Sequence, residues 1–298
     1  MSFVATRPAL SHKMPPSSVR WVTRQLKDPY VRERSAHPVK FRARSAFKLM
    51  EIDNQYTIFK HQDVHTVVDL GAAPGAWSQV VAYKLGWLQP ASHDKKVKLP
   101  LSASISGFGV KEYIPERWIK DGPAAEDEFL DPLADLDEAE EVPQQRGRGA
   151  IIALDLIRMS PIPGVQSIQQ NFLHEQAHAY LDALLKSTPG SNGMADIILS
   201  DMAANATGSR AHDVGSCLEI AESVFNFTKT HLRAAESIGR RRGGVLVMKY
   251  FAHPLMAQFS KELLEPNFHY VHINKPRSSR SESSECYWIC MGWKGSAV

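Results

Sequence analysis

The chain has 298 residues, of which 43% are hydrophobic and 22% charged, and its formal net charge is +3. This composition is typical of a globular protein with a full core, and no apolar run approaches the roughly 20 residues that a membrane-spanning helix needs. The three cysteines, Cys217, Cys286 and Cys290, are too few for a disulfide framework. They also lack the His and Cys neighbours of a metal site, so we expect no bound metal.

The charge is distributed unevenly along the chain. Residues 1–60 carry twelve Lys or Arg and four acids, residues 122–145 carry nine acids and no base, and residues 225–298 carry eleven bases and five acids. Basic regions at both ends indicate a polyanionic partner, although solvated surface charge would give the same pattern. Residues 1–16 are expected to be a transit segment or a flexible arm, because the start of the chain contains bases and serines but no acid.

Two helices, a strand and a third helix are predicted before a long insertion. Two serines precede VRWVTRQL, which predicts a capped helix start, and a basic amphipathic helix is expected over about 43–55. HTVVDL at 65–70 predicts a buried strand, with WSQVVAYKLGW as the helix after it. Residues 90–147 are rich in proline and acid, so we expect an insertion within a single domain that covers residues 17–298.

Strands and helices alternate after the insertion. The pattern predicts strands at 150–156, 195–201, 243–251, 269–274 and 286–293, and helices at 171–185, 212–238 and 254–264. Such alternation with short links is typical of an α/β protein, in which a mostly parallel sheet has helices on both faces. The last two strands have no helix between them, so an antiparallel hairpin is expected at one edge.

The turn in VVDLGAAPGAW follows the first predicted strand, at the place where a doubly wound sheet binds its ligands. Asp69 ends the strand, Gly71 and Gly75 let the backbone approach a ligand, Ala72 leaves room, and Pro74 sets the turn. The spacing is neither the G-x-G-x-x-G of dinucleotide-binding proteins nor a phosphate loop. An adenosyl ligand is therefore expected, with a tight turn that binds nothing as the alternative.

Further acids are expected at the carboxyl ends of neighbouring strands. Asp155 ends ALDL, where its carboxylate can accept hydrogen bonds from a ribose or an amine, and Asp201 ends ILSD. Together with Asp69 they favour a positively charged ligand over NAD, whose phosphates they would repel. S-adenosylmethionine, a nucleoside with a sulfonium and an amine, fits. Trp77 is expected to form a wall of the same site, with helix–sheet packing as the alternative.

Four charged residues suggest catalysis. Lys249 ends an apolar strand, and because burial penalises the charged ammonium, a buried lysine is a candidate general base. Lys48 lies among apolar residues of the amphipathic helix, and Glu285 begins the last strand. Each of these two alone is more often a surface charge, but with Asp201 they form a Lys–Asp–Lys–Glu set.

Six segments, in order along the chain, carry a family resemblance. They are FRARSAFKLMEI (41–52), VVDLGAAPGAWSQV (67–80), ALDLIRMSPIPGVQSIQQNF (153–172), ILSDMAANATG (198–208), VLVMKYF (245–251) and KPRSSRSESSECYWIC (275–290). In these segments the chain resembles the FtsJ family of RNA ribose 2′-O-methyltransferases. The resemblance implies a Rossmann-like methyltransferase fold with a seven-stranded sheet, S-adenosylmethionine as the methyl donor, and Lys48, Asp201, Lys249 and Glu285 as the catalytic residues.

The resemblance also implies roles for individual residues. Lys249 would accept the proton of the ribose hydroxyl, Asp201 and Glu285 would hold that lysine, and Lys48 would orient the ribose. The family usually has an aspartate at the position of Asn171, whose carbonyl we still expect to bind the adenine amino group. Phosphate contacts are expected from six arginines, namely Arg20, Arg24, Arg42, Arg44, Arg277 and Arg280.

The segment SSVRWVTRQLKDPYVRERS resembles the start of mitochondrial large-subunit rRNA uridine 2′-O-methyltransferases. The expected protein is thus a monomeric mitochondrial matrix enzyme that methylates a uridine ribose in rRNA, within an assembling large ribosomal subunit. One alternative is the same chemistry on tRNA or another RNA. Another is a non-catalytic assembly factor that keeps the fold, which the four filled catalytic positions disfavour.

Overall fold

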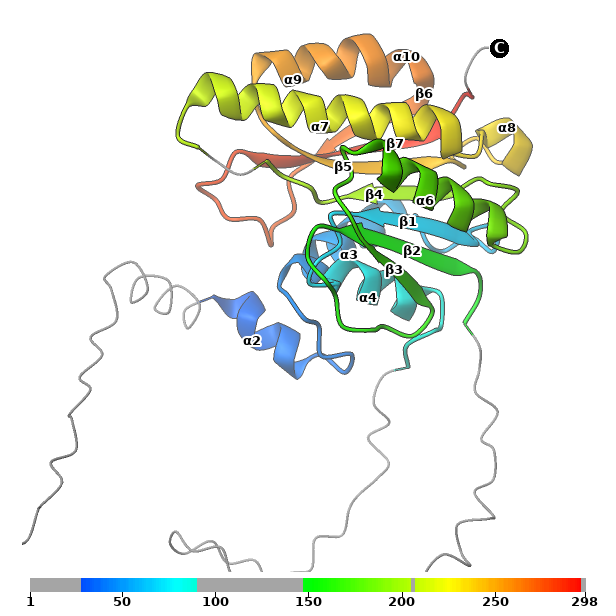
Figure 1. Ribbon diagram of the computed structural model, residues 1–298. Coiled ribbons are helices and arrows are strands. Elements are labelled where there is room, and N and C mark those ends of the chain that lie inside the picture. Colours follow the sequence, from blue (N-terminus) through cyan, green and yellow to red (C-terminus); the bar gives the residue numbers. More distant parts are fainter. Residues whose placement is uncertain (1–27, 90–146, 205–206, 296–298) are drawn as a thin grey trace, which may run out of the picture. The chain divides into compact units, whose positions relative to one another are not determined.

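The computed structural model describes residues 28–89, 147–204 and 207–295, all of which belong to one compact unit (Figure 1). The expected helix after the serine pair, the expected arm at residues 1–16 and nearly all of the insertion at 90–147 lie outside the described residues. The expected extent of the domain, residues 17–298, therefore stays a prediction.

One seven-stranded sheet forms the centre of the unit, in the order β3-β2-β1-β4-β5-β7-β6. The strands are β1 (Thr66–Leu70), β2 (Ala150–Asp155), β3 (Val165–Gln169), β4 (Ile197–Ser200), β5 (Val245–Phe251), β6 (Phe268–Asn274) and β7 (Glu285–Trp293). Strands β1 to β5 run parallel, whereas β7 runs antiparallel to both of its neighbours, β5 and β6. The mostly parallel sheet and the antiparallel hairpin at its edge are confirmed.

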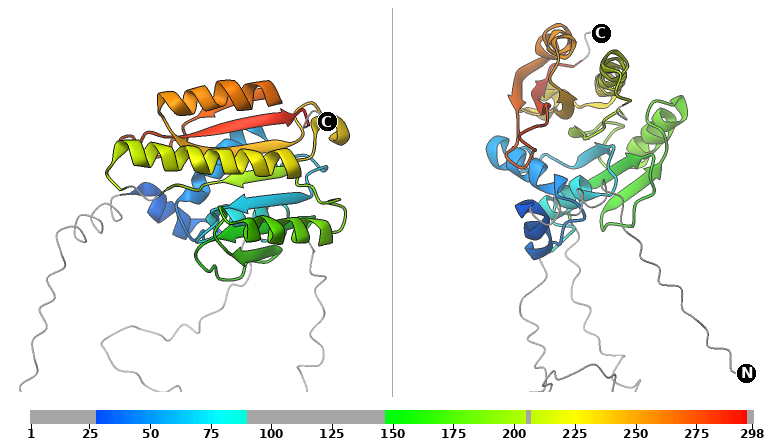
Figure 2. Two further views of the ribbon diagram at one scale, coloured as in Figure 1. Left: turned by 45° about the horizontal axis from the view of Figure 1, so that its top comes forward. Right: turned by 90° about the vertical axis from the view of Figure 1, so that its left-hand side faces the viewer.

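Helices cover both faces of the sheet (Figure 2). They are α2 (Pro29–Ala36), α3 (Ser45–Tyr56), α4 (Ala76–Lys84), α6 (Glu175–Ser187), α7 (Arg210–His231), α8 (Ala235–Ile238), α9 (Pro254–Phe259), the π-helical turn η2 (Ser260–Leu264) and α10 (Glu265–Asn267). In β1, Val67 packs in the cluster formed with α3 and α4, whereas Val68 and Leu70 pack in the cluster formed with α6, α7 and α9. Burial on both faces explains why the central strands are mostly apolar.

The sequence pattern does not predict β3 or α2. Strand β3 is at the edge of the sheet and only two of its five residues are half-buried, so it has no run of apolar residues. Helix α2 lacks an apolar face, but its start has a recognisable signal. The Asp28 carboxylate accepts the backbone N–H of Tyr30 at 3.0 Å, and Pro29 occupies the first turn.

The single long helix predicted over 212–238 is wrong, because the structure divides it into α7 and α8. Leu232 adopts an extended conformation and pairs with Ala195 in an isolated β-bridge. The N–H of Ala195 donates to the carbonyl of His231 at 2.7 Å, and the N–H of Arg233 donates to the carbonyl of Ala195 at 2.9 Å. These bonds to the segment before β4 replace the helical bonds and end α7.

Candidate functional site

A cavity of about 480 Å³ opens at the carboxyl ends of β1, β2 and β4. Its polar lining includes Asp155, Asn171 and Asp201, and the turn after β1 contributes Gly71 and Ala73. The rest of the lining is mainly apolar, with Leu154, Leu156, Phe172, Leu173, Met202, Ala203, Ala204 and Ile220. Apolar walls with a few polar groups are typical of a small-molecule site.

The carboxylate of Asp155 fixes the turn that borders this cavity. One oxygen accepts the N–H of Ala73 at 2.8 Å, and the other accepts the N–H of Ile157 at 2.8 Å. The side chain therefore joins the end of β2 to the turn after β1. This arrangement holds the Asp155 side chain at the cavity wall.

Asp69 lies fully buried beneath the turn and is not part of the cavity lining. The Ser78 hydroxyl donates to its Oδ2 at 2.6 Å, while its Oδ1 has no hydrogen-bond partner among the described residues. Burial, opposed by the Ser78 hydrogen bond and reinforced by the charges of Asp201 and Asp155, raises the pKa of Asp69 to about 7. Three neighbouring carboxylates, one of them incompletely hydrogen-bonded, fit a positively charged ligand.

The two glycines of the turn are required by neighbouring protein atoms. Gly71 has a φ of +73°, and a Cβ added there would lie 2.4 Å from Cγ of Met202. Gly75 has a φ of +102°, and its added Cβ would lie 2.7 Å from Ile162 and 2.9 Å from Arg42. Gly71 also lines the cavity and Gly75 does not, and the expected approach of a ligand to both glycines stays a prediction.

Three more residues expected at the ligand lie outside the cavity lining. Ala72 is buried and Pro74 is exposed. Trp77 is 2% exposed, its indole N–H donates to the carbonyl of Ser45 at 2.8 Å, and its ring centroid lies 5.6 Å from that of Tyr287. The interpretation of Trp77 as a wall of the ligand site is corrected. It packs α4 against α3 and β7.

The side chain of Arg42, expected at RNA phosphates, binds two loops of the protein itself. Its guanidinium donates to the carbonyl oxygens of Pro74 at 3.1 Å, Ser160 at 2.8 Å and Pro161 at 2.8 Å. These bonds tie the turn after β1 to the loop after β2. The guanidinium is thus used within the protein, and its expected phosphate contact stays a prediction.

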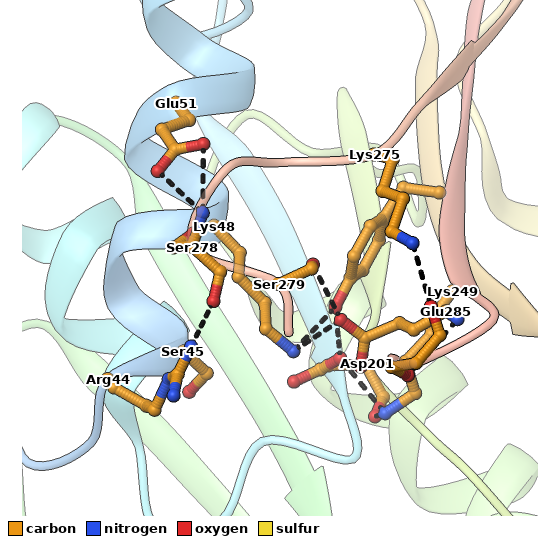
Figure 3. Close-up of polar contacts among 12 residues, drawn as sticks. Arg44, Ser45, Lys48, Glu51, Asp201, Lys249, Lys275, Ser278, Ser279 and Glu285 are labelled. Atoms are coloured by element: carbon orange, nitrogen blue, oxygen red, sulfur yellow. Dashed lines mark hydrogen bonds and ion pairs between the residues drawn. The ribbon is translucent and has the colours of Figure 1, made fainter. Parts of the chain in front are cut away.

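The four predicted catalytic side chains meet beside this cavity, in two ion pairs (Figure 3). The Lys249 ammonium lies 3.0 Å from Oδ1 of Asp201 and also donates to the main-chain carbonyl of Asp201. The Lys48 ammonium lies 2.6 Å from Oε1 of Glu285. Asp201 thus holds Lys249 as expected. Glu285 forms its ion pair with Lys48, and its expected part in holding Lys249 stays a prediction.

Tyr287 connects the two ion pairs and was not predicted. Its hydroxyl donates to Oδ1 of Asp201 at 2.8 Å and accepts a hydrogen bond from Lys48 at 3.3 Å. Burial raises the pKa of Tyr287 strongly, and the charges of Asp201 and Glu285 add to this, so the hydroxyl remains protonated. The sequence does contain a signal for Tyr287. It follows Glu285 by two residues in a strand, so both side chains point to the same face.

Glu285 is stabilised as a carboxylate. Burial alone would raise its pKa, but the charge of Lys48 and hydrogen bonds from Lys48 and Ser279 outweigh burial and lower it. The Ser279 hydroxyl donates to Oε1 of Glu285 at 2.8 Å. Ser279 was also missed, because it lies in an irregular loop in which no spacing rule marks one serine among several.

Helix α3 holds the loop between β6 and β7 (Figure 3). The Glu51 carboxylate accepts the backbone N–H of Arg277 at 2.6 Å and that of Ser278 at 3.1 Å. Arg44 donates to the carbonyl of Ser278 and forms an ion pair with Asp28. The side chain of Arg44 thus joins α3, the start of α2 and the loop, and its expected phosphate contact stays a prediction.

The remaining arginines expected at RNA stay predictions. Arg277 and Arg280 lie exposed on the loop between β6 and β7. Arg20 and Arg24 lie outside the described residues. In the ranges that the structure describes, no group of three His, Cys, Asp or Glu is placed to hold a metal ion. No helix in the same ranges is long and apolar enough to cross a membrane.

Comparisons with known proteins cover most of the chain. A sequence profile described as "FtsJ-like methyltransferase" matches residues 41–108 and 139–293. Two proteins named ribosomal RNA large subunit methyltransferase E are similar. That of Afipia carboxidovorans is 34% identical over 94% of this chain and 90% of its own length. That of Rhodopseudomonas palustris (strain HaA2) is 32% identical over 95% of this chain and 88% of its own.

A solved structure has the same fold. It is a crystal structure described as that of a ribosomal RNA methyltransferase from Plasmodium falciparum. The two superimpose with a TM-score of 0.55 and 21% sequence identity, over 86% of this chain and 100% of the other. At this identity the likeness concerns the fold.

Proposed function

The chain belongs to the FtsJ-like methyltransferase family, and we propose that it methylates a ribose 2′-hydroxyl in the RNA of the large ribosomal subunit. The observation that carries the proposal is the hydrogen-bonded network of Lys48, Glu285, Tyr287, Asp201 and Lys249. Asp201 belongs both to this network and to the wall of the cavity. The names of the relatives support ribosomal RNA as the substrate.

S-adenosylmethionine is the proposed ligand of the cavity. Asp155 and Asp201 would face its polar and cationic groups, and Asn171 would face the adenine. The side-chain carbonyl oxygen of Asn171 already accepts a hydrogen bond from the backbone N–H of Leu173 at 3.1 Å. This bond fixes the orientation of the side-chain amide. When bound, the ligand supplies a methyl group that its sulfonium makes electrophilic.

The protein's own task is to position a ribose hydroxyl and to remove its proton. Lys249, in its neutral form, accepts that proton, and Asp201 fixes the amine through its 3.0 Å contact. Lys48 lies at the other side of Tyr287, where its positive charge stabilises a developing oxyanion and orients the ribose. Such alignment of groups removes much of the entropic cost of bringing reactants together.

We further propose that the substrate is a uridine in mitochondrial rRNA, within an assembling large subunit in the matrix. The bases Arg7, Lys13, Arg20 and Arg24, in a stretch without acids, support import into mitochondria. The test is ribose-methylation mapping of mitochondrial and cytosolic rRNA, with and without the gene. One large-subunit uridine of mitochondrial rRNA should lose its methyl group. Unchanged mitochondrial methylation, or a loss in cytosolic rRNA alone, would reject the compartment.

Replacing Arg42 by glutamine should weaken binding of S-adenosylmethionine by about tenfold, because the turn after β1 loses its hydrogen bonds to the loop after β2. Isothermal titration calorimetry measures this. The matched control is Arg158→Gln, which removes an exposed arginine from the same loop and should leave the dissociation constant unchanged. Equal affinities for the two variants would show that Arg42 does not organise the site.

A further inference from the structure

One face of the edge strand β6 carries a row of aromatic side chains. Tyr270 and His272 point to the same face, since they are two residues apart in a strand. Their rings are nearly parallel, with an interplanar angle of 6° and centroids 6.4 Å apart. Tyr56, at the end of α3, continues the row with its ring centroid 5.4 Å from that of His272. The His272 side chain is exposed, and both tyrosines are half-buried.

Two arginines lie at the Tyr270 end of this row. The guanidiniums of Arg241 and Arg242 lie 5.5 Å and 5.3 Å from the centroid of the Tyr270 ring. Both residues are exposed, and the structure gives neither an ion pair with any acid in the ranges it describes. The neighbouring Arg240, by contrast, is paired with Asp63 at 2.9 Å. Two like charges on one ring form a local site for anions.

The other end of the row reaches the catalytic network. In the sheet, Asn274 of β6 is paired with Tyr287 of β7, and Tyr287 is paired with Lys249 of β5. Tyr270 of β6 is paired with Met291 of β7, which lies beside the start of β5. A hollow of about 430 Å³, lined by residues that include Gln55, Asn274, Lys275 and Arg277, lies between this end and the loop that carries Ser279. The four residue steps from Tyr270 to Asn274 span about 13 Å.

We propose that this surface, made by Tyr56, His272, Tyr270, Arg241 and Arg242, binds a single-stranded segment of the RNA substrate next to the methylated nucleotide. Aromatic faces interleaved with cations are the features by which proteins hold single strands, since bases stack on the rings and phosphates contact the cations. The proposal rests on the proposed function, because it supplies a path for RNA that leads away from Lys249. It assigns RNA contacts to residues outside the cavity and outside the loop between β6 and β7.

The test measures binding of a fluorescein-labelled single-stranded oligouridylate by fluorescence anisotropy at several salt concentrations. Arg241→Gln/Arg242→Gln should raise the dissociation constant about tenfold at 0.1 M salt. If each arginine contacts one phosphate, the slope of log K against log salt should also fall by about 1.4. Tyr270→Leu, which keeps apolar packing, should weaken binding several-fold without changing the slope. The matched control Lys186→Gln/Lys261→Gln removes two charges from α6 and η2, on the opposite face, and should bind like the wild type.

Methyl transfer to large ribosomal subunits gives a second measurement. The arginine double variant should raise the KM for the particle and keep the wild-type kcat. An unchanged dissociation constant and salt slope would overturn the proposal. Normal binding to the oligonucleotide with weaker binding to intact particles would also overturn it, in favour of a ribosomal protein as partner. If the wild type transfers no methyl group, the proposed function fails, while the anisotropy measurement still tests this surface.

Discussion

Replacing Lys249 by methionine should reduce the rate of methyl transfer to RNA by a factor of about 10³ or more, with little change in the affinity for S-adenosylmethionine. The ammonium group contacts Asp201 and is not part of the lining of the 480 Å³ cavity, so its removal leaves the ligand's walls in place. Loss of a positioned general base costs about 10²–10⁴ in rate. Single-turnover transfer and calorimetric binding of S-adenosylmethionine measure the two quantities separately.

A matched control for this variant is Lys261→Met, which alters an exposed lysine on η2 and should transfer methyl groups at the wild-type rate. Lys48→Met should also slow transfer, because its ammonium contacts both Glu285 and Tyr287 in the network. Lys249→Met enzyme with a rate within about tenfold of the wild type would remove Lys249 from the role of base.

Replacing Asp69 by asparagine should make the protein more stable than the wild type at pH 8, and this difference should vanish towards pH 4. The pKa of Asp69 is raised to about 7 from its ordinary value of 3.8, mainly by burial. The folded state therefore holds a proton that the unfolded state releases as the pH rises through this window. Stability falls across the window, by up to about 4 kcal/mol. Urea unfolding at a series of pH values measures the difference.

The asparagine keeps an oxygen for the Ser78 hydroxyl, so the hydrogen bond at 2.6 Å can be retained. Asp182→Asn is the matched control: it alters a surface carboxylate paired with Lys186, and it should differ from the wild type by less than about 0.5 kcal/mol at every pH. A difference between Asp69→Asn and wild type that stays constant from pH 4 to 8 would contradict the raised pKa.

The core strands, and their order along the chain, could be predicted from the sequence because each is buried on both faces. Strand β1, for example, has no exposed residue, and its neighbours β2 and β4 are equally apolar at their centres. Strand β3 is not readable, because an edge strand with exposed Gln166 and Ser167 needs no apolar pattern. The end of α7 is not readable either, since a long-range pairing between Leu232 and Ala195 sets it.

Part of the candidate site could likewise be predicted from the sequence, and part of it could not. Charged residues at strand ends could be predicted to meet, because the carboxyl ends of parallel strands lie at one edge of the sheet. Which lysine pairs with which acid could not, since Glu285 reaches Lys48 through the position of α3 over β7. The same limit applies to Arg42 and Arg44, whose guanidiniums bind main-chain carbonyls that no sequence pattern identifies.

The most direct test of the account is methyl transfer by the purified full-length protein. Large ribosomal subunits that lack the modification are incubated with S-adenosylmethionine labelled in its methyl group, and the RNA is digested to nucleosides. The account predicts label in a 2′-O-methylated nucleoside, proposed to be 2′-O-methyluridine, with the wild type and none with Lys249→Met. Label in a base-methylated nucleoside, or equal 2′-O-methylation by both proteins, would contradict it.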